Sequence, residues 1–214
     1  MTNVVFWPDV SSYQVNVNDQ FTRQFLMFKV SEGTTYVDPK AVANGAWCTA
    51  NSGPGKKMVG YGGYHVWWPG NEQAQANLFF ANVKLSPYLV AMIDVESWGG
   101  KIKGDNSASI TALANLFAAK LGQRRVKVYA NQGDLTALYP KRPAWLGVIK
   151  ASYSSQAPAE PWVGWQYTDG STNWPIPNGW PRSTPPFGNC DHNAYYGTVQ
   201  QFAAEYGIAP AKAT

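Results

Sequence analysis

The sequence has few of the side chains on which metal, disulfide and cofactor chemistry depend. Its 214 residues include two histidines and two cysteines, Cys48 and Cys190. Neither a CxxC pair nor a Cys/His cluster occurs, and two thiols in a chain of this size form no disulfide framework. The segment Gly53-Pro54-Gly55-Lys56-Lys57 lacks the first glycine and the hydroxyl residue of a phosphate loop. We therefore expect free thiols, no metal site and no cofactor.

Charged side chains and long apolar runs are also scarce. Asp, Glu, Lys and Arg make up 14% of the chain, against about 25% in an average globular protein. No apolar window reaches about 18 residues, so no membrane span is expected. The chain begins with Val4-Val5-Phe6-Trp7, without the basic region and cleavage site of a secretory signal peptide. The sequence thus predicts neither membrane insertion nor a signal peptide.

Aromatic residues are abundant instead, with 10 Trp, 12 Tyr and 9 Phe. Such side chains offer a face for stacking and often line sites for sugars. The net charge of +4 suits a polyanionic partner such as nucleic acid or an anionic bacterial wall. Because no nucleic-acid recognition motif is present, nucleic acid is not the expected partner.

Apolar segments alternate with helical patterns along the chain, which indicates an α/β domain. Helices are expected from Asp38-Pro39 to Trp47, from Asn71 to Val83, from Ser107 to Leu121 and from Thr198 to Tyr206. The expected strands are Val4–Asp9, Phe25–Val30, Met58–Trp68, Leu89–Ile93, Val126–Ala130, Leu146–Ala151, Trp162–Tyr167 and Cys190–Asn193. Eight strand positions with crossovers predict a parallel, TIM-like (β/α) barrel. Several connections are too short for a helix, so an incomplete set of helices is expected.

One strand delivers two acids together. An uncharged run from Leu89 to Ile93 leads into Asp94-Val95-Glu96. Side chains alternate along a strand, so Asp94 and Glu96 face the same way. Two like charges in a partly desolvated place raise the pKa of one carboxyl, which keeps a carboxylic acid protonated near neutral pH. A solvated strand end is the alternative, but the buried run favours a catalytic pair.

Other acids fall at the carboxyl ends of predicted strands, where barrel enzymes carry their active sites. Together with the pair, these are Asp9, Glu32, Asp94, Glu96 and Asp191. Clustered carboxylates with aromatic neighbours and no metal ligands fit glycoside hydrolysis best. In that reaction one acid protonates the leaving oxygen, and a second group stabilises the charge at the anomeric carbon.

A family resemblance emerges from short motifs in a fixed order. They are Asp9-Val-Ser-Ser-Tyr-Gln, Lys29-Val-Ser-Glu-Gly-Thr-Thr-Tyr-Val-Asp-Pro39, Gly63-Tyr-His-Val66, Asp94-Val-Glu96, Trp165-Gln-Tyr167 and Cys190-Asp-His-Asn193. In this order they resemble the glycoside hydrolase family 25 lysozymes, the Chalaropsis-type muramidases common in phage endolysins. The resemblance implies a flattened barrel and cleavage of the β-1,4 bond between N-acetylmuramic acid and N-acetylglucosamine in peptidoglycan.

The resemblance also implies a role for each matching residue. Glu96 corresponds to the protonated general acid, and Asp94 to the ionised aspartate that orients the 2-acetamido group of the substrate as internal nucleophile. Asp9 and Asp191 correspond to two further aspartates of the cleft. The expected sugar contacts are Glu32, Tyr64, Trp67, Tyr129 and Tyr167.

Two of these roles have alternatives. Glu32 can equally be a partner of Lys29, and the place of Trp67 holds a smaller residue in many members. His65 and His192 are expected to be structural.

The expected partner is bacterial peptidoglycan, and a monomer is expected. The different class of hypothesis is a catalytically inactive barrel that binds glycans. We expect a catalytic domain over residues 1–208 and the start of a linker over 209–214, leading to a wall-binding or second lytic domain. Without a signal peptide, a phage lysin would accumulate in the host cytoplasm before lysis.

Overall fold

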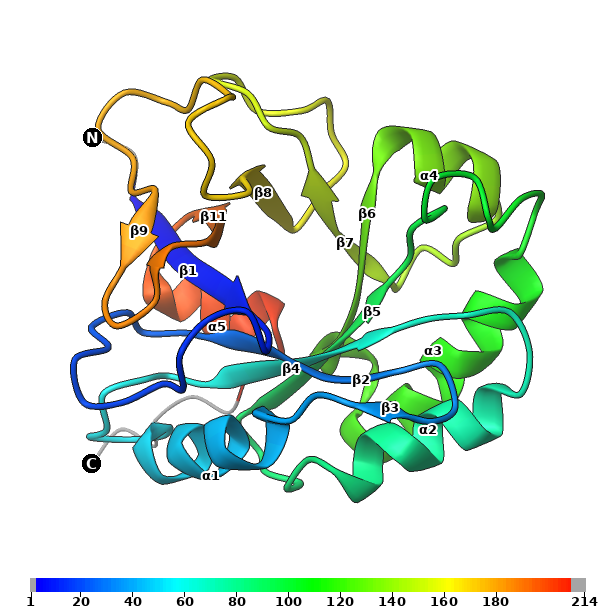
Figure 1. Cartoon of the computed structure of the whole chain (residues 1–214), viewed down its shortest axis with the longest axis horizontal. Coiled ribbons are helices and arrows are strands. Elements are labelled where there is room, and N and C mark those ends of the chain that lie inside the picture. Colours follow the sequence, from blue (N-terminus) through cyan, green and yellow to red (C-terminus); the bar gives the residue numbers. More distant parts are fainter. Residues whose placement is uncertain (1–2, 209–214) are drawn as a thin grey trace.

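The computed structural model describes residues 3–208 and contains a closed barrel of eight strands (Figure 1). Neighbouring strands around the barrel are, in order, β1 (Val4–Val10), β11 (Asp191–Tyr196), β8 (Gly164–Thr168), β7 (Gly147–Ala151), β6 (Val126–Asn131), β5 (Leu89–Asp94), β4 (Tyr61–Val66) and β2 (Met27–Glu32). Pairing of β1 with β2 closes the ring. The predicted eight-stranded α/β barrel is confirmed. Residues 209–214, the expected linker, lie outside the described residues.

Strand β11 runs against its neighbours, which corrects the expected all-parallel barrel. It pairs antiparallel with both β1 and β8, while the other seven barrel strands are parallel to one another. Asp191 is therefore the first residue of its strand and not at a carboxyl end. Because the strand is reversed, that first residue lies at the same rim as the carboxyl ends of the others, where it pairs with Asp9 of β1.

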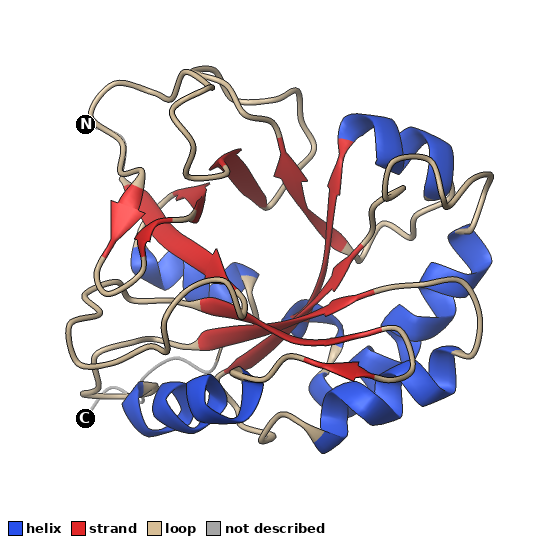
Figure 2. Ribbon diagram, viewed as in Figure 1, coloured by secondary structure: helices blue, strands red, loops and turns tan. Residues whose placement is uncertain are grey.

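Helices cover one side of the barrel (Figure 2). Helices α1 (Ala41–Asn51), α2 (Glu72–Ala81) and α3 (Ser107–Leu121) lie against strands β2, β4, β5 and β6. The side chain of Asn71 caps α2 as expected, and Thr198 forms a capping box with Gln201 at α5 (Val199–Glu205). A short helix α4 (Gln132–Leu138) after β6 is absent from the sequence prediction. None of the helices within residues 3–208 is long and apolar enough to cross a bilayer.

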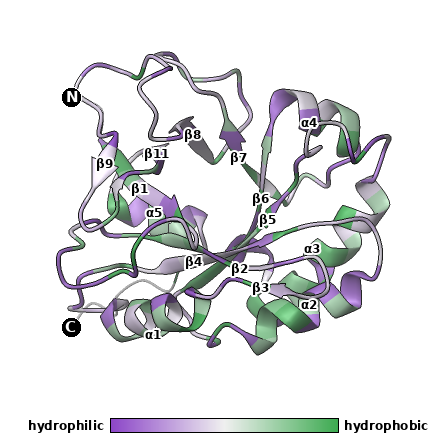
Figure 3. Ribbon diagram, viewed as in Figure 1, coloured by the Kyte–Doolittle hydropathy of each residue, from purple (hydrophilic) through white to green (hydrophobic). Residues whose placement is uncertain are grey.

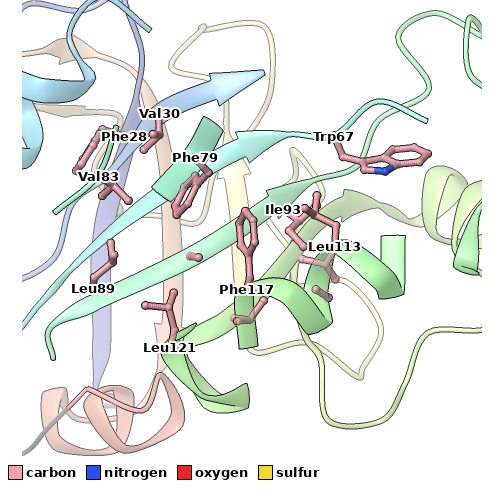
Figure 4. Packing of buried hydrophobic residues seen from close by; sticks show 14 of the residues in the cluster. Phe28, Val30, Trp67, Phe79, Val83, Leu89, Ile93, Leu113, Phe117 and Leu121 are labelled. Atoms are coloured by element: carbon pink, nitrogen blue, oxygen red, sulfur yellow. The ribbon is translucent and has the colours of Figure 1, made fainter. Parts of the chain in front are cut away.

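The outer faces of the covered strands build the main core. Val30, Leu89 and Ile93 point from the sheet toward α2 and α3, and Phe28 packs against Gly45 of α1 (Figure 4). Phe117 of α3 meets Phe79 of α2 at 4.7 Å between ring centroids. Hydrophobic and hydrophilic residues alternate along these helices (Figure 3), and the buried residues of α3 include Ile110 and Leu113. Burial of these large side chains stabilises the helical side of the barrel.

The interior of the barrel changes from apolar to polar along the strands. Alternate residues of one strand share a face, so Val5 and Trp7 of β1 lead to Asp9, and Val90 and Met92 of β5 lead to Asp94. At the apolar end, helix α5 adds Phe202 and Tyr206, whose rings pack around Trp7. The polar ends of the strands therefore open at one rim.

Aromatic side chains cover the outer face of β8 and β11, while α5 packs on Tyr195 of β11 from the closed end of the barrel. Trp165 and Tyr167 of β8 pack against Phe6 and Trp180. Trp180 belongs to a long segment between β8 and β9 (Ser183–Thr184), the first strand of a small hairpin with β10 (Gly188–Asn189). One further two-residue strand, β3 (Tyr36–Val37), extends β2. The segment after β8 thus takes the place of a crossover helix.

Candidate active site

A cleft of about 330 Å³ opens at the polar rim of the barrel. Seven of the residues predicted from the sequence line it: Asp9, Glu32, Tyr64, Asp94, Glu96, Tyr129 and Asp191. They come from six different strands or the residues directly after them. A larger hollow of about 480 Å³ at the other end of the barrel is lined by residues such as Met58 and Ile208 and by no carboxyl group. The smaller cleft, which holds the carboxyl groups, is therefore the candidate active site.

Asp94 and Glu96 form the central acid pair. Asp94 is 6% exposed, and its Oδ1 atom has no hydrogen-bond partner among residues 3–208. Burial, followed by the negative charge of Glu96, raises the pKa of Asp94 well above its ordinary value. Burial also raises the pKa of Glu96, but a hydrogen bond from the Asp94 carboxyl counteracts this. The pair therefore retains a proton above the ordinary range of a carboxyl group.

The position of that proton differs from the sequence expectation. A protonated Glu96 beside an ionised Asp94 was expected from the family resemblance. Burial raises the pKa of both carboxyls, and it favours the proton on Asp94 because Asp94 is the more deeply buried of the two groups. Glu96 is half-buried and more open to the cleft.

A second acid pair lies across the cleft. Burial and the charge of Asp9 raise the pKa of Asp191 well above its ordinary value. Burial also raises the pKa of Asp9, although two amides stabilise its carboxylate: Asn193 Nδ2 donates to Asp9 Oδ2 at 2.7 Å, and Gln166 Nε2 donates to the same atom at 3.0 Å. These two amide contacts make Asp9 the better ionised partner of this pair.

Gln166 connects this pair to the tyrosines and was missed as a site residue. Its Oε1 atom accepts from the hydroxyls of Tyr129 at 2.8 Å and Tyr153 at 2.9 Å. Gln166 lies inside the Trp165-Gln-Tyr167 motif, and the alternation of strand β8 turns it inward. That alternation was the signal that could have identified it.

The β2–β4 side of the cleft carries its only cation among the described lining residues. Lys29 Nζ lies 2.6 Å from Glu32 Oε2, and Trp68 Nε1 donates to Glu32 Oε1 at 3.0 Å. Trp98, with a positive φ of 49°, lines the cleft and stacks on Trp68 at 6.5 Å between ring centroids. Glu32 therefore pairs with Lys29, which is one of its two expected roles, and it also lines the cleft; its contact with a sugar stays a prediction.

Two predicted sugar contacts do not reach the cleft. Trp67 is fully buried, and its indole donates to Ser109 Oγ at 3.2 Å. Tyr167 is also fully buried, and its hydroxyl donates to the carbonyl of Pro181 at 2.5 Å. Each follows a residue that faces the cleft, Val66 or Gln166, so strand alternation turns it outward. The sugar-binding role expected for these two residues is therefore corrected.

The histidines and cysteines are structural, as expected. His65 lies between Ser31 and Gln75, and burial lowers its pKa to about 4. His192 contacts Thr184, and burial likewise lowers its pKa to about 4. Both cysteines are buried and free. Among residues 3–208, no group of three or more His, Cys, Asp or Glu side chains is arranged to hold a metal ion.

The buried acids make the cleft costly at neutral pH. The pKa of Asp191 is higher in the folded protein than its ordinary value of 3.8. Between these two pKa values, the folded state therefore holds more protons than the unfolded state. The free energy of unfolding therefore falls as the pH rises through this range. We expect Asp191→Asn to raise Tm by a few degrees at pH 7, with the gain shrinking toward pH 4. Thermal unfolding across this pH range measures the effect.

Asp105→Asn is the matched control. Lys141 lowers the pKa of the exposed Asp105 through a contact of 2.7 Å, so this carboxylate stabilises the fold at neutral pH. Its replacement should leave Tm at pH 7 unchanged or slightly lower. An Asp191→Asn protein no more stable than the parent at pH 7 would contradict the electrostatic cost assigned to the cleft.

Known proteins share this architecture and its motifs. Residues 8–173 match the profile of glycosyl hydrolases family 25; the match includes Asp9, Asp94 and Glu96 and ends before Trp174. The uncharacterized protein Rv3766 of Mycobacterium tuberculosis is 37% identical over 213 residues, 97% of this chain and 75% of that protein. The N,O-diacetylmuramidase of Chalaropsis sp is 29% identical over 203 residues, 89% of this chain and 90% of that enzyme.

The solved structures agree on the fold. A family 25 glycosyl hydrolase from Bacillus anthracis superposes with a TM-score of 0.74 at 22% identity, covering 95% of this chain and 94% of the other. The family profile spans most of the chain and includes the central acid pair. The chain therefore belongs to glycosyl hydrolases family 25 and is a glycoside hydrolase.

Proposed function

We propose that the protein is a lysozyme that hydrolyses the β-1,4 bond between N-acetylmuramic acid and N-acetylglucosamine in peptidoglycan. The observation that carries this proposal is the buried Asp94–Glu96 pair at the rim of the barrel, with raised pKa values on both carboxyls. A glycosidic oxygen leaves only when it is protonated, and a carboxyl that keeps its proton near neutral pH can supply that proton.

Glu96 is the group that delivers the proton. It is the more open member of the pair. When the acetamido N–H of a sugar approaches Asp94, the ionised form of Asp94 gains a hydrogen bond. The proton then moves to Glu96, which donates it to the leaving oxygen. The proton thus lies on Asp94 before the substrate binds and on Glu96 afterwards, so Glu96 can act as the general acid.

The acetamido oxygen acts as the nucleophile. It forms a bond to the anomeric carbon as the glycosidic bond breaks, and Asp94 stabilises the charge that develops on the acetamido nitrogen. The Glu96 carboxylate then accepts a proton from the water that attacks the same carbon. Two displacements at one carbon retain its configuration. Asp9 and Asp191 add negative potential beside the developing positive charge.

A glycan-binding barrel without activity is the competing hypothesis. Binding of a neutral sugar requires no protonated carboxyl, and each buried acid costs stability at neutral pH. The acid pairs are therefore better explained by catalysis.

We further propose that the protein cuts the cell wall of a phage host, because its ordered motifs resemble those of phage endolysins. Clearance of walls from candidate hosts, compared with walls from unrelated bacteria, tests this.

Replacement of Glu96 separates catalysis from binding. We expect Glu96→Gln to lower the rate of turbidity clearance of purified cell walls by about 10²- to 10⁴-fold, the usual contribution of a general acid. Binding to the same walls in a sedimentation assay should persist. Glu160→Gln, an identical change at an exposed position outside the cleft, should clear walls at the parental rate. Equal clearance by Glu96→Gln would remove Glu96 from this role.

The stereochemistry of the product tests the acetamido route. Proton NMR of a fresh digest should show the newly formed reducing end first as the β-anomer, because retention follows from two displacements at the same carbon. Mutarotation then produces the α-anomer. A first product with inverted configuration would rule out the acetamido group as nucleophile.

A further inference from the structure

The segment between β8 and β9, residues 169–182, carries two tryptophans in different surroundings. Trp180 packs against Tyr167 at 4.8 Å and Phe6 at 4.9 Å between ring centroids, and so fastens the segment to the barrel. Trp174 is 46% exposed. Because Trp180 already anchors the segment, the exposed indole of Trp174 is left for another purpose. Covering the exposed part of this indole with a ligand would be favourable.

Arg182 holds Trp174 in place. One guanidinium nitrogen donates to Thr168 Oγ1 at 3.2 Å and to the carbonyl of Ser171, and the other donates to the carbonyl of Trp174 at 2.9 Å. The backbone that carries the indole is thus tied to the end of strand β8. A backbone fixed in this way loses little conformational freedom when a ligand packs on the side chain that it carries.

Trp174 lies next to the cleft. Its ring centroid is 6.3 Å from that of Tyr153, at an angle of 49°. The hydroxyl of Tyr153 donates to Gln166, which in turn donates to Asp9. Strand β8 stands opposite β4 in the order of the eight strands. Trp174 therefore lies on the β8 side of the barrel and is connected to the cleft through Tyr153 and Gln166.

We propose that Trp174, backed by Tyr153, is a saccharide platform that extends the cleft beyond the acids and selects long glycan strands. The inference rests on the proposed lysozyme function. The apolar face of a pyranose ring packs on an indole, while its hydroxyls meet polar neighbours and water. The exposed Thr172 and Asn173 beside the indole supply such polar neighbours. A sugar several units from the scissile bond would reach this platform.

Binding measured as a function of strand length tests the platform. In a Glu96→Gln background, which prevents cleavage, calorimetry with purified peptidoglycan strands gives Kd for a disaccharide and for longer strands. We expect Trp174→Ala to raise Kd for long strands by about 3- to 10-fold, as expected for the loss of one aromatic stacking contact. Kd for the disaccharide should not change. Trp174→Phe should retain most of the affinity for long strands.

Leu85→Ala is the control, since Leu85 is 52% exposed and precedes β5 at the opposite end of the barrel. It should bind strands of every length like the parent. An unchanged Kd of Trp174→Ala for long strands, or an equal loss for the disaccharide, would overturn the platform. Failure of the otherwise unmodified protein to clear cell walls would overturn the proposed function instead, so the two failures are distinguishable.

Discussion

The placement of four buried or half-buried carboxyl groups at one rim of an apolar barrel is the constraint on which the site depends. Desolvation makes each charge costly, and two neighbouring charges make it costlier. Asp94 with Glu96, and Asp9 with Asp191, therefore keep protons that exposed carboxyls would lose. The fold sustains this cost through its large aromatic and aliphatic core. The acid groups of the cleft thus lower the stability of the fold, and in return they retain a proton that catalysis requires.

The strands produce this arrangement by simple alternation. Inward residues are apolar at the end closed by α5 and polar at the other end, so each strand supplies both a core residue and a site residue. Reversal of β11 preserves the pattern, because its first residue replaces the last residue of a parallel strand. The amides of Asn193 and Gln166 then give Asp9 a role different from that of its partner Asp191.

Much of this could be predicted from local patterns, and the rest depends on tertiary context. The buried run before Asp94-Val95-Glu96 indicated both the strand and the paired acids. The direction of β11 could not be predicted, since a short polar strand reads alike in either direction. Trp67 and Tyr167 were assigned to the sugar because they are aromatic, although alternation with Val66 and Gln166 turns them outward. The proton position depends on relative burial, which no pattern shows.

Aromatic side chains take the place of a helix on the outer face of β8 and β11. Trp180 replaces the packing of a missing helix, and Arg182 fixes the backbone that follows β8. The same segment can therefore protect β8 and present an indole beside the cleft.

Asp94 and Glu96 are expected to hold one proton between them. Carbon NMR of the side-chain carboxyls, recorded across a pH titration and assigned with Asp94→Asn and Glu96→Gln, measures this directly. The two signals should respond together, and one proton should be released well above the ordinary carboxyl range. Independent titration of both groups near pH 4 would contradict it.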